Sequence, residues 1–171
     1  MKSAKVVKLS TLSQAKLKEN VHYDPETGVF TRIKPTCGFS VGVILGGMTK
    51  DGYVRIQISG SRNHAHCLAW LYMTGEMPKE CIDHINGVRT DNRFCNLREA
   101  TRGQNAQNQR KPRVNNKSGF LGVYFHKAMG KFRAEIMING KTKGLGYFDT
   151  AEQAHKAYLE AKRKVHLFST I

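Results

Sequence analysis

The segment Cys81-Ile82-Asp83-His84-Ile85 places an acidic residue directly before a histidine, and such a pair could hydrolyse a phosphodiester bond. Hydrolysis needs a base that activates water and a positive charge near the phosphate and the leaving oxygen. A neutral His can be that base, and a divalent ion held by oxygens can supply that charge. The apolar neighbours predict a short strand, on which adjacent side chains point to opposite faces. One of the two side chains can then hold metal while the other faces the water.

Three asparagines follow the Asp83-His84 pair, at positions 92, 96 and 105. Asn105 lies about one turn into a predicted helix, and its amide oxygen is a hard ligand suited to Mg²⁺. The structural alternative is that Asp83 and Asn96 satisfy backbone groups in turns, which is the usual role of Asp and Asn. The spacing from the pair to the asparagines favours a catalytic site over that alternative.

Periodicity and turn signals predict the elements that position these residues. Strict alternation over Gly52–Ile58 predicts a half-buried strand with Val54, Ile56 and Ile58 on one face. Apolar residues at helical spacing over Ala65–Met73, with Gly75 just beyond, predict a helix. The remaining expectations are frayed residues over 1–10, a helix from the Thr11–Gln14 capping box to about Asn20, turns over 23–28 and 59–63, a strand over 29–33, an aperiodic polar segment over 86–99, and a helix from Thr101 to about Gln109.

The order of these residues resembles the HNH endonuclease motif of phage and intron homing enzymes. The matching elements are Ile82-Asp83-His84-Ile85-Asn86-Gly87, Asp91-Asn92, Asn96-Leu97-Arg98, Thr101 and Asn105, and the resemblance covers roughly residues 22–108. It implies a ββα-metal nuclease module in which Asp83 and Asn105 bind metal and His84 is the general base. Asn96 would be the central Asn that orders the loop and helps to orient the histidine, and Asn92 would order the loop. Cys67 departs from the motif, because relatives often have Arg after the preceding histidine.

Charge predicts a polyanionic partner. The chain has 28 basic and 13 acidic residues, and residues 111–171 hold 12 of the basic and 4 of the acidic ones. Neutralising phosphates releases counterions and drives association, so the last third is expected to contact nucleic acid on its own. No stretch is long and apolar enough to span a bilayer, and no secretory signal is recognised, so a cytosolic protein without a membrane partner is expected.

The four cysteines argue against structural zinc. They stand at positions 37, 67, 81 and 95, and none forms the close pair that structural zinc sites usually bring. Reduced and mostly buried thiols are the expectation for a cytosolic protein.

The C-terminal third predicts a three-stranded sheet with one helix on its back. Strands are expected over 122–126, 132–138 and 143–148, with a hairpin at Asn139-Gly140. A helix capped at Thr150 presents an apolar stripe of Ala154, Ala157, Tyr158 and Ala161. Residues 109–117 are expected to form a basic linker.

This third resembles the APETALA/ethylene-response DNA-binding domain over roughly residues 117–168. The resemblance rests on Ser118-Gly119-Phe120-Leu121-Gly122-Val123, Gly130-Lys131-Phe132-Arg133-Ala134-Glu135-Ile136 and the segment from Leu145 to Ala154. In that family the sheet lies in the major groove. The resemblance therefore implies four groove-facing residues, Tyr124, His126, Arg133 and Glu135, and three phosphate contacts, Lys131, Lys141 and Lys143. A solvated basic face is the structural alternative.

The expected protein is α+β, with a nuclease module and its lead-in over 1–108, the linker over 109–117 and the DNA-binding module over 118–171. It would cut double-stranded DNA with one Mg²⁺ or Mn²⁺ per site and no small-molecule cofactor, as a monomer or weak dimer and, by resemblance, as a homing endonuclease. A catalytically inactive DNA-binding regulator and an RNA-directed protein are the alternatives. One site per chain suits a nick, or a double-strand break made by two copies.

Overall fold

The computed structural model describes residues 12–36 and 38–171, and these residues divide into two compact units. The first unit contains the described residues up to His84 together with Val88–Glu99, and the second contains Ile85–Gly87 and Ala100–Ile171. The structure is mixed α+β, as predicted. The predicted division into a module over 1–108, a linker over 109–117 and a module over 118–171 stays a prediction. Residues 1–10, which were expected to be frayed, lie outside the described residues.

The first unit begins with helix α1 (Gln14–Asn20) and a small antiparallel sheet of β1 (Val21–Tyr23), β2 (Phe30–Arg32) and β3 (Ile44–Leu45). The Ser13 side chain accepts a hydrogen bond from the Lys16 amide and caps α1. The predicted cap, Thr11, lies outside the described residues. The predicted turn between the first two strands is present, because the Gly28 amide donates to the Asp24 carbonyl at 2.8 Å.

A second antiparallel sheet joins β4 (Gly47–Met48), β5 (Val54–Ile58) and β6 (Ser61–His64), and it leads into helix α2 (Ala65–Thr74). The alternation predicted for β5 is confirmed, since Ile56 and Ile58 are buried. The turn predicted over 59–63 is wrong in extent. Ser59 and Gly60 alone turn the chain, both with positive φ, and β6 starts at once. Such two-residue turns match the twist of paired strands.

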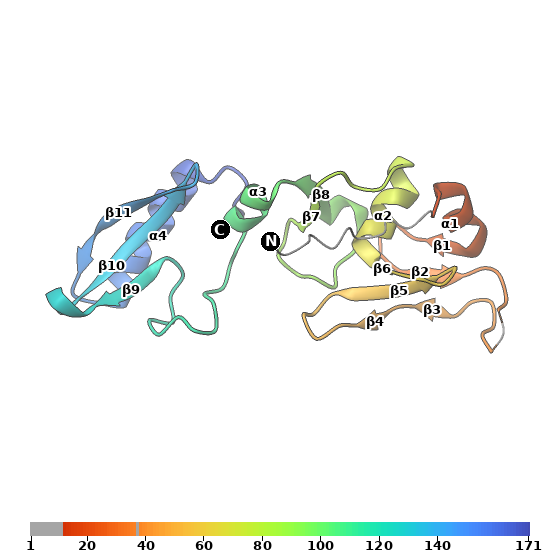
Figure 1. The fold of residues 1–171 in the computed structure, drawn as a ribbon, viewed down its shortest axis with the longest axis horizontal. Helices are drawn as coiled ribbons and strands as arrows, with labels where there is room; N and C mark the ends of the chain where they lie inside the picture. The colour runs from red at the N-terminus through yellow and green to blue at the C-terminus, as the bar shows by residue number, and fades with distance from the viewer. Residues whose placement is uncertain (1–11, 37) are drawn as a thin grey trace, which may run out of the picture. The chain divides into compact units, whose positions relative to one another are not determined.

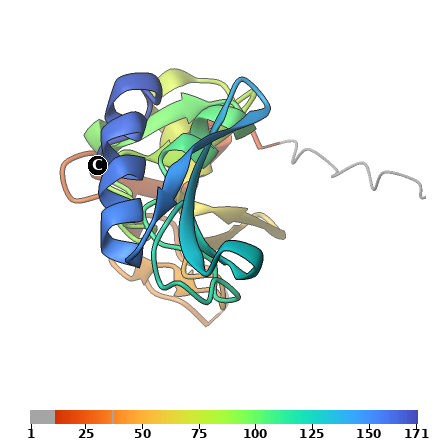
Figure 2. The ribbon, with the colours of Figure 1, turned by 90° about the vertical axis from the view of Figure 1, so that its left-hand side faces the viewer.

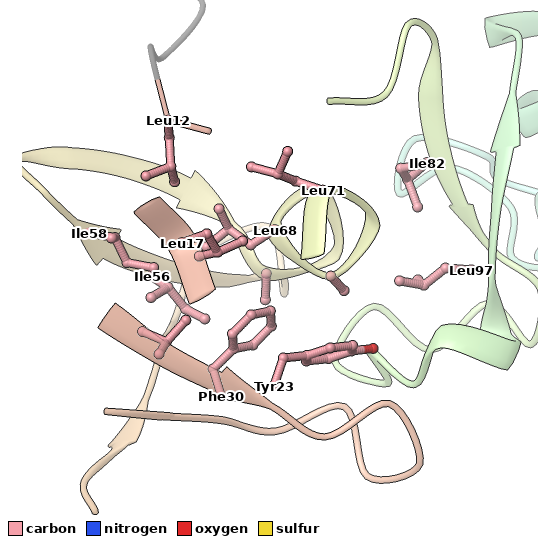
Figure 3. Close-up of a cluster of buried hydrophobic side chains, with 13 residues drawn as sticks. Leu12, Leu17, Tyr23, Phe30, Ile56, Ile58, Leu68, Leu71, Ile82 and Leu97 are labelled. Atoms are coloured by element: carbon pink, nitrogen blue, oxygen red, sulfur yellow. The ribbon is translucent and has the colours of Figure 1, made fainter. Parts of the chain in front are cut away.

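These elements share one hydrophobic core, which Figure 3 shows in close-up. Leu17 from α1, Phe30 from β2 and Leu68 from α2 are almost fully buried in it. Ile82 and Leu97, from the next two strands, belong to the same cluster. The core therefore extends to the strand that carries Asp83 and His84.

Strand β7 (Cys81–His84) pairs with β8 (Leu97–Ala100), and the short 3₁₀ helix η1 (Phe94–Asn96) precedes β8. The strand predicted at 81–85 is confirmed. The expectation of an aperiodic segment over 86–99 is wrong at its end, where η1 and β8 form. A four-residue strand is too short to show a period in the sequence, because its alternation spans only two residues on each face.

The second unit contains helix α3 (Arg102–Gln107), the sheet β9 (Val123–His126), β10 (Lys131–Ile138) and β11 (Lys141–Phe148), and helix α4 (Ala151–Val165). Figures 1 and 2 show α4 along one face of this antiparallel sheet. The short 3₁₀ helix η2 (Lys127–Met129) links β9 to β10. The predicted three-stranded sheet with one helix is therefore confirmed.

Alternate residues of β10 form the core between the sheet and α4. Ala134 and Ile136 are buried against Ala154 and Tyr158 of α4. Lys162 was not expected in this core, yet only 1% of it is exposed, and its Nζ donates to the Gln109 carbonyl at 2.7 Å. Among the described residues, no helix is long and apolar enough to cross a membrane.

Candidate functional site

Asp83 and His84 occupy the end of β7, and both side chains are buried, with 5% and 4% exposed. Ile82 precedes them and packs into the core of the first unit. The strand therefore fixes the backbone of the pair, and little of either side chain is left in contact with bulk water.

Arg98 of β8 forms an ion pair with Asp83. Its Nε and Nη2 atoms both donate to Oδ2 of Asp83, at 2.9 and 2.8 Å. A buried carboxylate is costly to ionise without an opposite charge, so this guanidinium stabilises the charged form of Asp83. Sequence reasoning included Arg98 in the motif but assigned it no role. The contact depends on the pairing of β7 with β8, and β8 was not predicted from the sequence.

His84 is held by the loop that follows it. Its Nε2 atom lies 3.4 Å from Oδ1 of Asn92, and the Asn92 side-chain amide donates to the Thr90 carbonyl at 3.1 Å. Burial lowers the pKa of His84 below the ordinary histidine value, while Asn92 and Asp83 oppose that shift. A neutral ring at neutral pH is the form that can accept a proton.

Two side chains hold the loop that follows β7, one at its end and one from β1. Nδ2 of Asn96 donates to the Asp91 carbonyl at 2.8 Å, and the buried Tyr23 hydroxyl donates to the Asn92 carbonyl at 2.7 Å. Burial raises the pKa of Tyr23, so its phenol keeps the proton that it donates. Asn96 thus bonds the backbone of the loop, and its predicted roles in ordering the loop and orienting His84 stay predictions.

A cluster of rings surrounds His84. The rings of His66 and His84 lie 5.1 Å apart, edge to face, and those of His64 and His66 stack at 5.0 Å. Tyr53 packs within 6 Å of all three histidine rings. Burial, with smaller effects from His84 and His64, lowers the pKa of His66 to about 3. No periodicity in the sequence could reveal that these rings gather around the predicted base.

Asn105, the second predicted metal ligand, lies on α3 in the second unit. The predicted capping box holds the start of this helix, because the Gln104 amide donates to Oγ1 of Thr101 at 3.2 Å and the Gln104 side chain accepts from the Thr101 amide at 2.8 Å. The pairing of Asn105 with Asp83 stays a prediction.

A metal ion at Asp83 would find few charged side-chain ligands among the described residues. Among the described residues, no group of three or more His, Cys, Asp or Glu side chains could hold a metal ion. A metal ion at Asp83 would therefore depend on amide oxygens and water for its other ligands. Mg²⁺ fits such a site, because it usually keeps several waters and takes one or two carboxylates from a protein.

The face of the C-terminal sheet opposite α4 carries polar and aromatic side chains. The strand register places Tyr124 and Tyr147 on either side of Arg133. The Arg133 guanidinium lies 5.5 Å from the Tyr147 ring centre, and its Nη2 donates to Glu135 at 2.7 Å. The His126 ring contacts the same tyrosine at 5.3 Å. The four residues predicted to face the groove are thus brought together on one face.

The three predicted phosphate contacts are placed differently. Lys131 forms an ion pair with Asp149 at 3.0 Å. A β-bulge between Ala134 and Glu135 shifts the register, so Lys141 and Lys143 stand opposite Ile138 and Ile136, on the side that faces α4. Both lysines are exposed on the edge strand β11. Their contact with phosphate stays a prediction.

The fold and the two sites define a class: a small α+β protein with a buried Asp–His pair on a strand, and a basic three-stranded sheet backed by a helix. Family models agree with this description. A model described as HNH endonuclease matches residues 63–107, and a model described as AP2 domain matches residues 118–166. The chain carries an HNH endonuclease domain followed by an AP2 DNA-binding domain.

One solved structure is similar to part of the chain. It concerns DNA binding and cleavage by the HNH homing endonuclease I-HmuI, and it is 28% identical with a TM-score of 0.41. The match covers 53% of this chain and 51% of the solved chain, so the chain spans about half the length of that protein. No curated protein matches the chain.

Proposed function

We propose that the chain is a metal-dependent DNA endonuclease that hydrolyses phosphodiester bonds at Asp83 and His84, and that its biological role is that of a homing endonuclease. The observation that carries the proposal is the buried pair at the end of β7, with Arg98 on the carboxylate and a histidine whose pKa is lowered. A purely structural pair in a turn has no need of a guanidinium bonded to its buried carboxylate or of a histidine whose pKa is lowered.

His84 is the general base in this proposal. The neutral His84 ring, whose Nε2 lies 3.4 Å from Oδ1 of Asn92, would take a proton from water on a ring nitrogen. The water oxygen then bonds to phosphorus, and the bond to the leaving oxygen breaks. The contacts of His66 and Tyr53 limit rotation of the ring, which keeps the accepting nitrogen in place.

Asp83 and Asn105 are the proposed metal ligands. A bound Mg²⁺ or Mn²⁺ would neutralise negative charge on the phosphate and on the leaving oxygen. Both Arg98 donors bond Oδ2 of Asp83, and the carboxylate would offer an oxygen to the ion.

The AP2 sheet supplies affinity and site selection in this proposal. Arg133 is central on the outer face, and Glu135 fixes its guanidinium by an ion pair. A guanidinium held in a defined plane can bond two acceptors of a guanine edge at once. Duplex DNA is the proposed substrate, because the major groove admits such a face.

Plasmid cleavage with Mg²⁺ or Mn²⁺ tests the proposal. His84→Ala is expected to cut at least 100-fold more slowly than wild type, since a positioned general base contributes roughly 10²–10⁴-fold. His22→Ala is the matched control, because His22 is an exposed histidine on β1. If wild type and His84→Ala bind DNA equally and neither cuts, the chain is a DNA-binding regulator.

Two further arms test substrate and division of labour. Arg133→Ala should weaken DNA binding about tenfold yet still allow metal-dependent cutting at high protein concentration. Loss of cutting with binding retained would contradict the separation of roles. Tighter binding to RNA than to duplex DNA would overturn the substrate, and sequencing both strands of a cleaved target distinguishes a nick from a double-strand break.

A further inference from the structure

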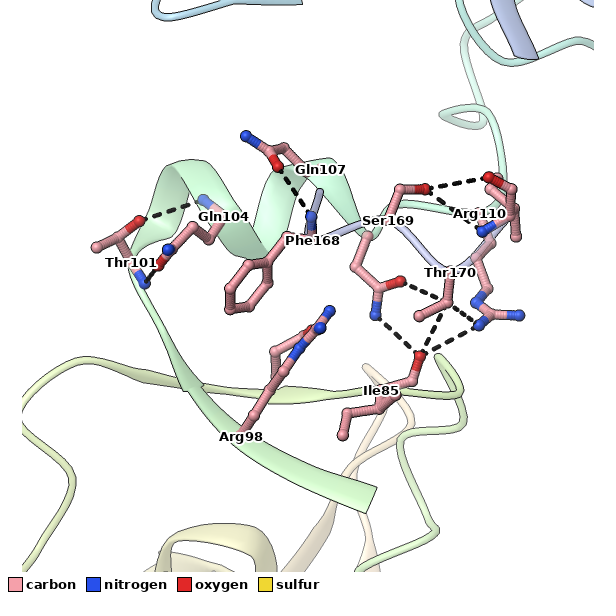
Figure 4. A network of polar contacts seen from close by, with 12 residues as sticks. Ile85, Arg98, Thr101, Gln104, Gln107, Arg110, Phe168, Ser169 and Thr170 are labelled. Carbon is pink, nitrogen blue, oxygen red and sulfur yellow. Dashed lines mark hydrogen bonds and ion pairs between the residues drawn. The ribbon is translucent and has the colours of Figure 1, made fainter. Parts of the chain in front are cut away.

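The main-chain carbonyl of Ile85 accepts hydrogen bonds from three side chains of the second unit. The donors are Oγ1 of Thr170 at 3.0 Å, Nη2 of Arg110 at 3.1 Å and Nδ2 of Asn108 at 3.3 Å. Thr170 also contacts Oδ1 of Asn108 at 2.9 Å and accepts from Arg110. These four residues are called the Ile85 cluster, and Figure 4 labels three of them, Ile85, Arg110 and Thr170, which lie close together.

The members of the Ile85 cluster come from parts of the chain with different roles. Ile85 directly follows His84, the proposed base, in the chain. Asn108 is the C-cap of α3, one turn beyond Asn105, and only 5% of it is exposed. Thr170 lies beyond α4, the helix of the AP2 domain. The Thr170 hydroxyl therefore connects the segment after α4 with two positions near proposed nuclease residues. These positions are Ile85, which follows His84, and Asn108, which follows Asn105.

The segment that carries Thr170 is attached at both ends. His166, the C-cap of α4, contacts the Met137 carbonyl of β10 through Nε2 at 2.7 Å. The Ser169 amide donates to the His166 carbonyl at 2.9 Å and closes a turn. The Phe168 amide donates to Oε1 of Gln107, in α3, at 3.4 Å. Thr170 is thus held on a short connection between the AP2 sheet and α3.

We propose that Thr170 is a positioning residue for the nuclease reaction. Its hydroxyl has one proton to share between the Ile85 carbonyl and Oδ1 of Asn108, and by lying between these two acceptors it sets where the chain after His84 meets the end of α3. The AP2 domain then has a second task besides holding DNA, because its C-terminal segment completes the support of the nuclease centre. This inference rests on the proposed function.

A positioning role predicts an effect on the rate of cutting rather than on DNA affinity. The Ile85 carbonyl keeps two donors when the Thr170 hydroxyl is lost, so the fold should survive. Catalysis is more sensitive than folding to small displacements, because a misplacement of about 1 Å can cost on the order of 100-fold in rate. The loss of the Thr170 hydroxyl removes one of three donors and should displace the reacting groups by less than this. We therefore expect cutting to slow about tenfold.

The test compares three variants of the full chain under single-turnover conditions with saturating duplex DNA and Mg²⁺. Thr170→Val replaces the hydroxyl by a methyl group and should cut about tenfold more slowly, with the DNA dissociation constant within about twofold of wild type. Thr170→Ser keeps the hydroxyl and should restore the rate. Ser169→Ala is the matched control, since within the described part of the chain this hydroxyl contacts only the Ile171 main chain, and it should cut like wild type.

Hydrogen exchange of the α3 amides, measured without DNA or metal, provides a readout independent of activity. Thr170→Val should speed exchange at the end of α3, where the Asn108 amide donates to Asn105, and Thr170→Ser should not. The inference is overturned if Thr170→Val cuts and exchanges like wild type, or if binding and cutting fall together. If wild type itself does not cut, the proposed function fails, and the exchange comparison still decides whether Thr170 positions α3.

Discussion

Replacing Arg98 by Gln is expected to destabilise the first unit by about 3 kcal/mol at pH 7. The substitution removes both charge-assisted donors from Oδ2 of Asp83, a carboxylate that is only 5% exposed. Breaking a buried ion pair by removing one partner costs roughly 3–5 kcal/mol. The lower end of that range applies here, because 24% of the Arg98 side chain is exposed and water can reach the site once it is shortened.

Urea unfolding followed by Trp70 fluorescence measures this change. Trp70 is the single tryptophan, and it lies on α2 against Phe94, so its emission reports the first unit alone. With a slope of about 1.5 kcal/mol per molar urea, a loss of about 3 kcal/mol lowers the midpoint by about 2 M. Chelator is included so that no divalent ion contributes.

Arg93→Gln is the matched control. Arg93 also bonds an aspartate through two nitrogens, at 2.8 and 2.6 Å from Asp91, but 47% of its side chain is exposed. Solvent screens such a pair, so the midpoint should move far less. A double-mutant cycle with Asp83→Asn completes the test, and the two changes should be strongly non-additive. Equal midpoints for the two arginine variants, or additive changes in the cycle, would refute the coupling between Arg98 and Asp83.

Two further predictions concern stability. Acidification from pH 7 to pH 5 should destabilise the first unit, with about 2 kcal/mol from His66, because burial lowers its folded pKa to about 3 while the unfolded value is about 6.5. The unfolded chain therefore binds this proton more tightly than the folded chain. The contribution of His66 to the free energy of unfolding is fully present above about pH 6.5 and is lost as the pH falls below that value. Unfolding curves followed by Trp70 fluorescence at several pH values measure this dependence. Gly122→Ala should destabilise the AP2 domain by several kcal/mol, seen by circular dichroism, because the new Cβ would lie 2.1 Å from the Tyr158 ring.

Each of these predictions has a control within the chain. His66→Gln should flatten the pH slope, whereas Gln in place of the exposed His22 should leave it unchanged; equal slopes would contradict the assignment. Gly130 also has a positive φ, but nothing lies within 4 Å of the position its Cβ would take. Gly130→Ala should therefore cost only the backbone strain of about 1 kcal/mol, and an equal loss at both glycines would contradict the steric argument.

Some elements could be predicted from local signals in the sequence. These signals are turn residues, side chains that cap the backbone of their own helix, and a clear alternation of apolar and polar residues. The Asn139-Gly140 turn, the Thr101 capping box and the alternation of β5 are of this kind, and all three are confirmed. Motif spacing predicted Asp83 and His84 as site residues because the chemistry depends on residue type, and their role stays a prediction. These predictions required no knowledge of which segments meet in space.

The remaining features depend on tertiary contacts. β8 has too few residues for a period, and it becomes a strand by pairing with β7, so the role of Arg98 could not be assigned. The ring cluster joins His64 and His66 to a histidine about twenty positions away in the sequence. The bulge opposite Ala134 changed the faces of Lys141 and Lys143, and nothing in the composition of β11 marks it.

The alternation of β10 has a consequence for how the protein could acquire new targets. Arg133, Glu135 and Met137 point away from α4, while the residues between them form the core with that helix. If the sheet contacts bases as proposed, substitutions at the outward positions can alter base preference at little cost in folding. Such an element could be retargeted by a few exchanges on one sheet face, while the proposed nuclease residues, which precede it in the chain, stay unaltered.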